Sequence, residues 1–333
     1  MSRLQAPAVS RHSQIMGLGT YRPRTRVPNS ELVERIDSSD EWIRSRSGII
    51  ERRWSQADET VVMMSVAAAQ GALEEADLSP NDVDLVLVAT VSHLMQTPSA
   101  AALVAHELGA TPAGAIDISA ACAGFCYGVG MASDLVRTGT AQHVLVIGVE
   151  RLSSLLNLDD RGTAFIFADG AGAVVVGPSE TPQIGPTIWG SDGAQADLIR
   201  SGQAWDEVFA AAEPVWPALA MEGSSVYRWA SYEMSTIAEQ TLERSGLTVQ
   251  DLDVFVPHQA NMRITDLMVR RLGLPDRVSV GRDIATQGNT SAASVPLALD
   301  RLRQDGQAHR GDLALLVAFG AGLTYAAQVV TVP

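Results

Sequence analysis

The sequence contains an internal repeat, and this feature constrains the fold more than any other. Residues 73–88 align without a gap to residues 242–257, an offset of 169 (242 − 73). Both segments have the pattern of a helix end, a Leu-centred turn, an Asp-x-Asp step and a buried strand. The same offset places residues 144–147 on residues 313–316, a second pair of apolar strands. We therefore expect two similar α/β halves fused in tandem.

The apolar runs and the segment between them predict how the chain is divided. Four continuous runs suit strands in sheets that are covered on both faces, namely residues 85–89, 144–148, 173–177 and 313–318. We expect a first half at residues 1–178 and a second at residues 179–333. Residues 179–231 are irregular and hold four of the six tryptophans, so we interpret them as a connection and cap.

Composition excludes several classes of protein. At 333 residues the chain exceeds one typical core, and its net charge of −14 argues against general nucleic-acid binding. No apolar run reaches about 18 residues, so we expect no membrane span. Residues 1–13 lack the apolar core of a signal peptide, and the two cysteines, four residues apart, agree with a reducing cytoplasm. Lysine is absent, which excludes a lysine Schiff base.

Cys122 lies where a strand pattern changes to a helix pattern. Residues 114–119 predict a short buried strand that ends in small residues, and residues 123–137 predict a helix. At a helix N-terminus, free N–H groups and the helix dipole favour thiolate over thiol. We therefore interpret Cys122 as a sulfur nucleophile, and the alternative is a buried cysteine that only packs.

His258 and Asn289 lie at two further junctions between a strand pattern and a helix pattern. The repeat equates Cys122 with Ser291 (122 + 169), two residues after Asn289, so the thiol and the amide would lie near a pseudo-twofold axis. A thiol, an imidazole and an amide together are the parts of a Cys-His-Asn site. Each residue alone also fits a structural role, as a hydrogen-bonded histidine or a turn asparagine.

Five segments, in order, resemble the β-ketoacyl-acyl-carrier-protein synthase III family, whose members start type II fatty-acid synthesis. They span nearly the whole chain, at residues 39–43, 121–125, 160–163, 256–261 and 288–294. The resemblance implies an α/β thiolase fold, a five-layered αβαβα sandwich of two pseudo-repeated halves, and a homodimer. This agrees with the repeat.

The resemblance also implies roles for individual residues. Cys122 looks like the nucleophile that accepts the acyl group, and His258 and Asn289 would bind the thioester oxygen of the malonyl group. The N–H groups of Cys122 and Ala321, in a run of small residues that allows close approach, would form the oxyanion hole. The residues implied to hold coenzyme A are Trp42 and Arg161 at the adenine, Arg46 at the phosphates, and Arg263 and Ser224 near the pantetheine.

The implied reaction is a decarboxylative condensation. Cys122 takes an acyl group from an acyl-CoA, malonyl-acyl-carrier protein loses CO2, and the resulting carbanion equivalent attacks the acyl-cysteine. Coenzyme A enters as a thioester substrate, and no metal or redox cofactor is needed. The implied partners are therefore an acyl-CoA, malonyl-acyl-carrier protein and a second copy of the chain.

Four arginines are candidates for docking the acidic carrier protein. Arg263, Arg270 and Arg271 lie at i, i+7 and i+8, on one face of the helix predicted after His258. Arg228 is a fourth candidate. The alternative is a solvated helix face without a partner.

Three residues depart from the family pattern. Thr97 stands where some relatives have a large aromatic residue that closes the acyl pocket of the partner subunit. A smaller side chain leaves room for a branched or longer starter. Ser224 replaces an asparagine, and Ala321 replaces a glycine, which preserves the N–H donor if the φ angle is negative.

Three other functions remain open from the sequence. A relative in secondary metabolism would prime a polyketide or transfer an acyl group without condensation. A papain-like hydrolase also has Cys, His and Asn in this order. A non-catalytic partner subunit would keep the fold, although the presence of Cys122 argues against it.

Overall fold

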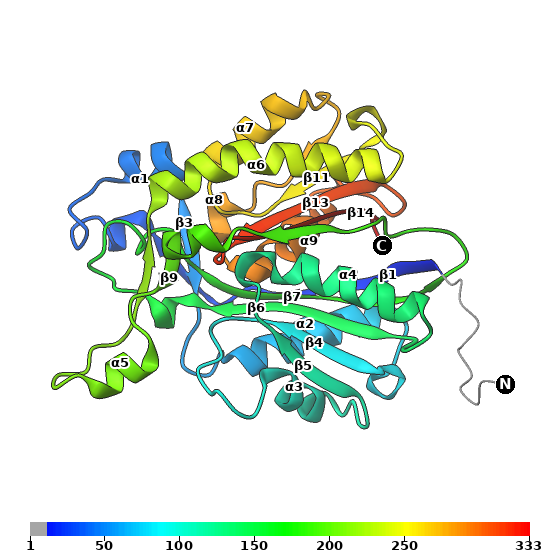
Figure 1. Ribbon diagram of the computed structural model, residues 1–333, viewed down its shortest axis with the longest axis horizontal. Coiled ribbons are helices and arrows are strands. Elements are labelled where there is room, and N and C mark those ends of the chain that lie inside the picture. The colour runs from blue at the N-terminus through cyan, green and yellow to red at the C-terminus, as the bar shows by residue number, and fades with distance from the viewer. Residues whose placement is uncertain (1–11) are drawn as a thin grey trace.

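Two five-stranded sheets form the centre of the molecule (Figure 1). The computed structural model describes residues 12–333, so most of the segment examined for a signal peptide lies outside the described residues. The first sheet has the strand order β1-β7-β6-β4-β5. Its strands are β1 (His12–Tyr21), β4 (Leu85–Ala89), β5 (Gly114–Ile118), β6 (Val144–Arg151) and β7 (Asp169–Ser179).

The second sheet repeats this arrangement, with the order β12-β11-β13-β14-β8. Its strands are β8 (Ile188–Ser191), β11 (Val254–Pro257), β12 (Ser279–Val280), β13 (Leu313–Gly320) and β14 (Thr324–Thr331). β11 pairs in parallel with β12 and β13, just as β4 pairs with β5 and β6. The tandem halves predicted from the repeat are confirmed.

Helices complete a five-layered sandwich (Figure 1). α2 (Val61–Glu75) and α3 (Ala100–Leu108) cover the outer face of the first sheet, and α6 (Gly223–Arg244) and α7 (Met262–Leu272) cover that of the second. α4 (Gly124–Arg137) and α9 (Ser294–Gln304) lie between the sheets, in one buried apolar cluster with both. The predicted αβαβα architecture is confirmed.

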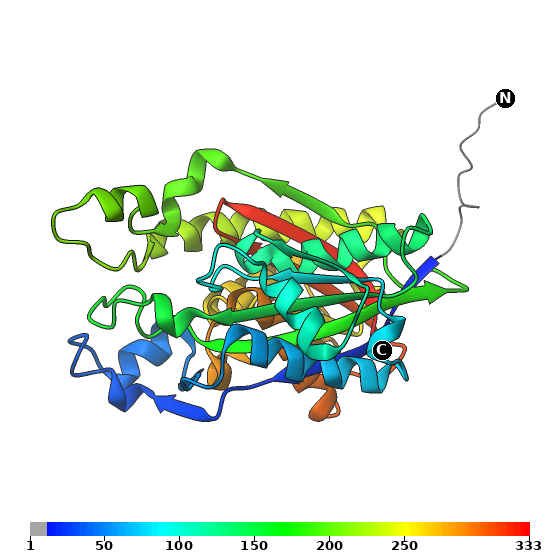
Figure 2. The ribbon, with the colours of Figure 1, turned by 90° about the horizontal axis from the view of Figure 1, so that it is seen from below.

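Shorter elements surround one end of the sandwich. They are β2 (Thr25–Pro28), α1 (Asp40–Ser47), β3 (Glu51–Trp54), β9 (Ile199–Ser201), α5 (Trp205–Ala210), β10 (Leu219–Met221) and α8 (Ile284–Gln287). α5 extends away from the layers in both views (Figures 1 and 2). None of the helices in residues 12–333 combines the length and the hydropathy needed to cross a membrane.

The segment expected as a connection and cap also supplies a strand. β8 lies within residues 179–231 and pairs with β14 at the edge of the second sheet. We keep the boundary near residue 178 as a proposal, because β7 ends at Ser179 and the next strand along the chain joins the other sheet.

β5 is a strand, but the prediction that it is buried is wrong. Its residues are exposed or half-buried because β5 is the outer strand of the first sheet, with only β4 beside it. The carboxylate of Asp117 accepts the N–H groups of Ala100 and Ala101, each at 2.8 Å, and so caps α3. The side chain of Ile116 is left without a neighbouring layer and is 44% exposed.

The turn that carries Cys122 is shifted by one residue relative to the repeat. Ala121 and Ser291 have the same left-handed φ angles, 45° and 48°, and this equivalence is an offset of 170 (291 − 121). α4 and α9 begin three residues after these two positions. Cys122 therefore corresponds to Ala292, and its predicted equivalence with Ser291 is wrong. The second half has one more residue between its first repeated strand and this turn.

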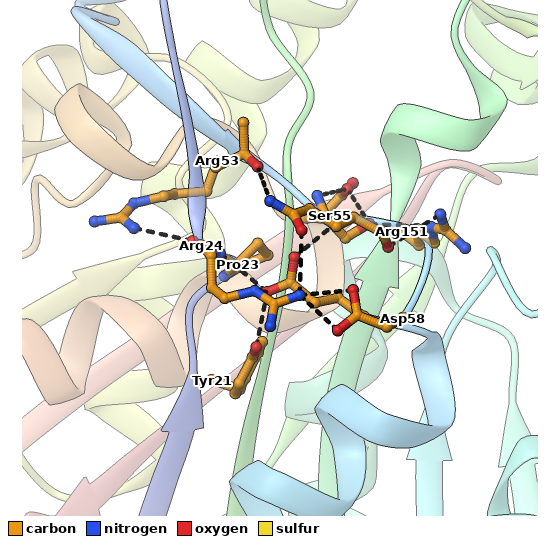
Figure 3. A network of polar contacts seen from close by, with 11 residues as sticks. Tyr21, Pro23, Arg24, Arg53, Ser55, Asp58 and Arg151 are labelled. Carbon is orange, nitrogen blue, oxygen red and sulfur yellow. Dashed lines mark hydrogen bonds and ion pairs between the residues drawn. The ribbon is translucent and has the colours of Figure 1, made fainter.

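A polar network joins the ends of β1, β3, β6 and β7 (Figure 3). The Tyr21 hydroxyl donates to Glu59 at 2.7 Å, and Arg151 donates to the Ser55 hydroxyl at 3.0 Å. The buried carboxylate of Asp169 accepts both the N–H and the hydroxyl of Ser55. The segment after β3 is therefore fixed against the first sheet.

Candidate active site

Cys122 lies in a short turn where the two halves meet. It belongs to the 3-10 helix η3 (Ala121–Ala123), which packs against η7 (Ser291–Ala293) of the other half. A Cβ on Gly320, at the end of β13, would lie 2.5 Å from the Cys122 nitrogen. Glycine permits this approach, which brings the backbone of the second half against the nucleophile candidate.

Burial controls the protonation of Cys122. Loss of hydration raises the pKa of the buried thiol to about 12, and the charge of Glu150 acts in the same direction. A hydrogen bond with Ser291 opposes this increase but does not overcome it. Burial thus opposes the thiolate that the position of Cys122 before α4 was predicted to favour. A thiol that is protonated at rest needs a group that takes its proton when it reacts.

His258 enters the site from the end of β11. Its N–H donates to the Val317 carbonyl at 2.7 Å, and its Nδ1 lies 2.6 Å from the Ser294 Oγ. Burial lowers the pKa of His258 to about 3, so the imidazole is neutral. The Ser294 oxygen also accepts the Gln259 N–H at 3.4 Å, and we infer that its own hydrogen points to Nδ1. This leaves the ring hydrogen on Nε2, which can then donate to a ligand.

Asn289 is held by its backbone on both sides. Its N–H donates to the Ile166 carbonyl at 2.9 Å, and its carbonyl accepts the Ala168 N–H at 2.8 Å. The side-chain Oδ1 accepts the Ser291 N–H at 2.8 Å. This bond orients the amide and leaves Nδ2 as the group that can donate to a ligand.

One cavity of about 400 Å³ brings the three predicted residues together. Cys122, His258 and Asn289 all line it. Phe319 lines it as well, with its ring edge-on to the His258 ring at 5.3 Å between centroids. The five residues predicted to hold coenzyme A line the same cavity, namely Trp42, Arg46, Arg161, Ser224 and Arg263.

α1 presents Trp42 to this cavity. Ser39 caps the helix by accepting the Trp42 N–H at 3.1 Å. The Arg161 guanidinium carbon lies 4.6 Å from the centroid of the Trp42 ring, and that of Arg46 lies 5.8 Å away. A stacking surface beside two cations suits a planar base that carries phosphates.

Two other predicted residues lie outside the cavity lining. Ala321 follows Gly320 in the turn after β13, and its φ angle is not positive, as the prediction required. Thr97 is exposed, and its neighbours Leu94 and Met95 line a second cavity of about 570 Å³ beside β5. Within one chain, Thr97 is therefore not part of the site.

The four docking candidates lie on α6 and α7. Arg263 and Arg271 each lie over a tyrosine ring of α6, at 4.8 and 4.6 Å from the ring centroids. Arg228 and Arg271 line a groove of about 550 Å³ that Ser224 shares with the main cavity. Arg270 is exposed on α7. The predicted face is thus beside the entrance to the site.

Sequence reasoning missed two groups behind the site. Ser294 contacts His258, and the buried carboxylate of Glu150 accepts the hydroxyl of Ser291 at 3.0 Å. A signal for Glu150 exists, because a carboxylate near the end of the apolar run at residues 144–149 is unusual in a covered strand. No sequence pattern connects Ser294 to His258.

Comparisons with known proteins agree with this geometry. Residues 116–193 match the family described as 3-Oxoacyl-[acyl-carrier-protein (ACP)] synthase III, and residues 242–332 match its C-terminal part. A β-ketoacyl-acyl-carrier-protein synthase III of Streptomyces glaucescens is 52% identical over 333 residues, which cover 100% of both chains. The chain belongs to the 3-oxoacyl-acyl-carrier-protein synthase III family.

Solved structures extend this result to the fold. The priming β-ketosynthase from the R1128 polyketide biosynthetic pathway has a TM-score of 0.97 and 47% identity, over 100% of this chain and 99% of that one. The 3-oxoacyl-acyl-carrier-protein synthase III of Aquifex aeolicus has a TM-score of 0.89 and 37% identity, over 96% and 100%. As a synthase III family member, the chain is a condensing enzyme of the acyltransferase type with the thiolase fold. The interpretations as a papain-like hydrolase and as a non-catalytic subunit are wrong.

Gly320 offers a test of the contact between the halves. We expect Gly320→Ala to lower condensing activity by about 100-fold, because the new Cβ would displace the Cys122 backbone by a fraction of an ångström or more. Ala321→Gly, one residue further on, is the matched control and should retain most of the activity. Steady-state kinetics checks both variants. Wild-type activity in Gly320→Ala would show that this approach does not position Cys122.

Proposed function

We propose that this enzyme condenses an acyl-CoA starter with malonyl-acyl-carrier protein to give 3-oxoacyl-acyl-carrier protein, through an acyl-enzyme on Cys122. The observation that carries the proposal is the single cavity in which Cys122, His258 and Asn289 meet. These residues supply a nucleophile and two neutral hydrogen-bond donors, which is what acyl transfer followed by formation of an enolate requires.

In the first half-reaction, the Cys122 sulfur attacks the thioester carbonyl of the acyl-CoA. The N–H groups of Cys122 and Ala321 hold the oxyanion of the tetrahedral intermediate. The close approach of Gly320 to the Cys122 nitrogen supports this assignment, because it brings the two backbone segments to one side of the sulfur. Coenzyme A then leaves.

Coenzyme A extends from the sulfur to the rim of the cavity. Its adenine stacks between Trp42 and Arg161, its phosphates lie near Arg46, and Arg263 and Ser224 line the path of the pantetheine. Arg161 lies over Trp42 at 4.6 Å, so its side chain moves outward to admit the base. The positive charge at the rim offsets the net negative charge of the chain where the phosphates bind.

In the second half-reaction, the malonyl group loses CO2 while His258 and Asn289 donate to its thioester oxygen. Charge develops on that oxygen in a buried cavity, where fixed donors act more strongly than in water. A neutral imidazole is sufficient for donation, in agreement with the lowered pKa of His258. The carbon then attacks the acyl-cysteine. No metal or redox cofactor takes part in these steps.

We propose that this reaction initiates type II fatty-acid synthesis in the cytoplasm. Priming of a polyketide is a second candidate, favoured by the 47% identity to the priming ketosynthase of the R1128 pathway. The two roles use the same chemistry and differ in the carrier protein. The ratio of kcat/KM values for malonyl groups on a fatty-acid carrier and on a polyketide carrier distinguishes them.

We propose that the enzyme is a homodimer joined along β5. An outer strand with free backbone groups is a ready site for pairing, and apolar side chains gather beside it. Ile116, Leu94 and Met95 are 44%, 51% and 56% exposed in the single chain. A second copy on this edge would cover them and bring Thr97 toward the acyl pocket of the partner.

Substitution of Thr97 tests the proposed dimer and the choice of acyl-CoA starter together. If Thr97 reaches the partner's acyl pocket, Thr97→Phe should abolish use of isobutyryl- and isovaleryl-CoA but keep use of acetyl-CoA, because the ring fills the space for the branch. Thr111→Phe, at another exposed threonine that precedes a proline, is the control. Initial rates with the three CoA esters give the answer. Unchanged starter preference in Thr97→Phe would contradict the proposal.

Substitution of His258 or Asn289 should slow only the second half-reaction, the condensation. We expect His258→Ala and Asn289→Ala to form the acyl-enzyme at close to the wild-type rate and to lose about 100-fold or more in condensation, since each donor acts on the enolate. Stopped reactions analysed by intact mass separate the two steps. The exposed His106→Ala serves as control. Failure of both variants to acylate would contradict these roles.

If Arg270 and Arg271 dock the carrier protein, reversing their charge should change only the KM for malonyl-acyl-carrier protein. Arg270→Glu should raise the KM for malonyl-acyl-carrier protein by about tenfold and leave the KM for acyl-CoA unchanged, because an exposed charge steers the acidic carrier. Combination with Arg271→Glu should add to the effect, although Arg271 also donates to the Ser231 carbonyl. Arg137→Glu on α4 is the control. An unchanged KM for the carrier in the double variant would exclude this face.

A further inference from the structure

Polar groups lead from Cys122 into the interior of the first half. The Ser291 hydroxyl lies beside the Cys122 thiol and lowers its pKa, and this hydroxyl donates to Oε1 of Glu150 at 3.0 Å. Glu150 has 0% of its surface exposed. Its Oε2 accepts the Ser92 hydroxyl at 2.5 Å and the Val91 N–H at 3.2 Å.

Among residues 12–333, Glu150 forms no ion pair that would explain a buried carboxylate. Beyond the three groups above, its remaining hydrogen-bond partner within these residues is the Thr90 hydroxyl at 3.3 Å. The adjacent Arg151 turns its guanidinium to Ser55 and to the Gln56 carbonyl. On the opposite strand, β7, Glu150 pairs with a glycine. A buried carboxylate without an ion pair is costly, so a role in the chemistry is a better explanation than packing.

We propose that Glu150 accepts the proton of Cys122 through Ser291. The inference deepens the proposed function and rests on it, because it takes Cys122 as the nucleophile. As sulfur attacks the acyl-CoA carbonyl, the S–H bond breaks and its proton goes to the Ser291 oxygen, while the original Ser291 hydrogen passes to Oε1. Coenzyme A leaves as the thiolate. Acyl-Cys122, a Ser291 hydroxyl and a neutral Glu150 remain.

The same proton returns in the second half-reaction. The electron pair left by CO2 forms the new carbon–carbon bond, and the displaced Cys122 thiolate takes the proton back from Glu150 through Ser291. One negative charge enters with the malonyl group and one ends on Glu150, so charge is balanced. While the enolate develops, Glu150 is neutral and does not repel it inside the protein.

The electrostatics of the site support this direction of transfer. Burial raises the pKa of Glu150 to about 7, which suits a group that takes up and releases a proton near neutral pH. The raised pKa of Cys122 contains a contribution from the Glu150 charge, which disappears when the proton arrives there. The pair shares one negative charge, and moving it creates no additional buried charge. His258 does not fit this role, because Ser294 engages Nδ1 and Nε2 already carries a hydrogen.

Ser291→Ala is the variant that tests the proposal most directly. Ala121, at the equivalent position of the other half, has the same left-handed φ angle, so alanine fits this conformation. Glu150→Gln is the second variant. Ser133→Ala is the control, because it removes a buried hydroxyl that bonds only to Ser13 among the described residues. The rates of Cys122 alkylation by iodoacetamide and of single-turnover acylation are measured by intact mass between pH 6 and pH 9.

We expect both rates to fall by about 100-fold at pH 7 in Ser291→Ala and Glu150→Gln, with the KM for acyl-CoA within about twofold of wild type. The variant rates should rise about tenfold per pH unit as hydroxide replaces Glu150, whereas the wild-type profile levels off above about pH 7. A purely structural role would not change the profile.

Wild-type rates and a wild-type profile in Ser291→Ala would overturn the proposal. If Glu150→Gln does not fold, Ser291→Ala decides alone. If no acyl-CoA acylates the wild type, the proposed function fails, and the comparison of alkylation rates still decides whether Glu150 receives the proton.

Discussion

The two halves of the molecule touch through their backbones at points where a side chain would not fit, and the site depends on this contact. A Cβ on Gly148 of β6 would lie 2.4 Å from the Ala292 oxygen of the second half, and a Cβ on Gly320 of β13 would lie 2.5 Å from the Cys122 nitrogen of the first. Each half thus places its turn against a strand of the other. Because of these two backbone contacts, the thiol of the first half meets the imidazole and the amide of the second half in a single cavity.

The same close packing sets the protonation of the site. Burial raises the pKa of Cys122 to about 12 and lowers that of His258 to about 3, so it disfavours the charged form of both side chains. Oriented donors are already in place for the charge that develops during the reaction. The buried carboxylate of Glu150 lies behind these side chains and accepts the hydroxyl of Ser291, which lies beside Cys122. Cys122 loses its proton when it accepts the acyl group and regains the proton when it releases that group. A nearby group that can hold one proton between these two steps therefore suits a condensing enzyme.

Much of the fold and most of the cavity lining could be predicted from the sequence, because apolar periodicity and a repeat report directly on strands and their order. The protonation of Cys122 could not, since a helix N-terminus is visible in a pattern and the depth of burial is not. The burial of β5 was mispredicted because the position of a strand in its sheet depends on topology. The partnership of Glu150 with Ser291 joins residues 141 apart, and only the folded chain reveals it.

The most direct test of this account is the intact mass of the enzyme after mixing with a panel of acyl-CoAs, followed by malonyl-acyl-carrier protein. The account predicts one acyl adduct on Cys122, absent in Cys122→Ala, that is discharged as 3-oxoacyl-acyl-carrier protein. The acyl-CoA that gives the adduct identifies the starter. An adduct that persists after malonyl-acyl-carrier protein is added, or no adduct with any acyl-CoA, would contradict the condensation proposed for Cys122, His258 and Asn289.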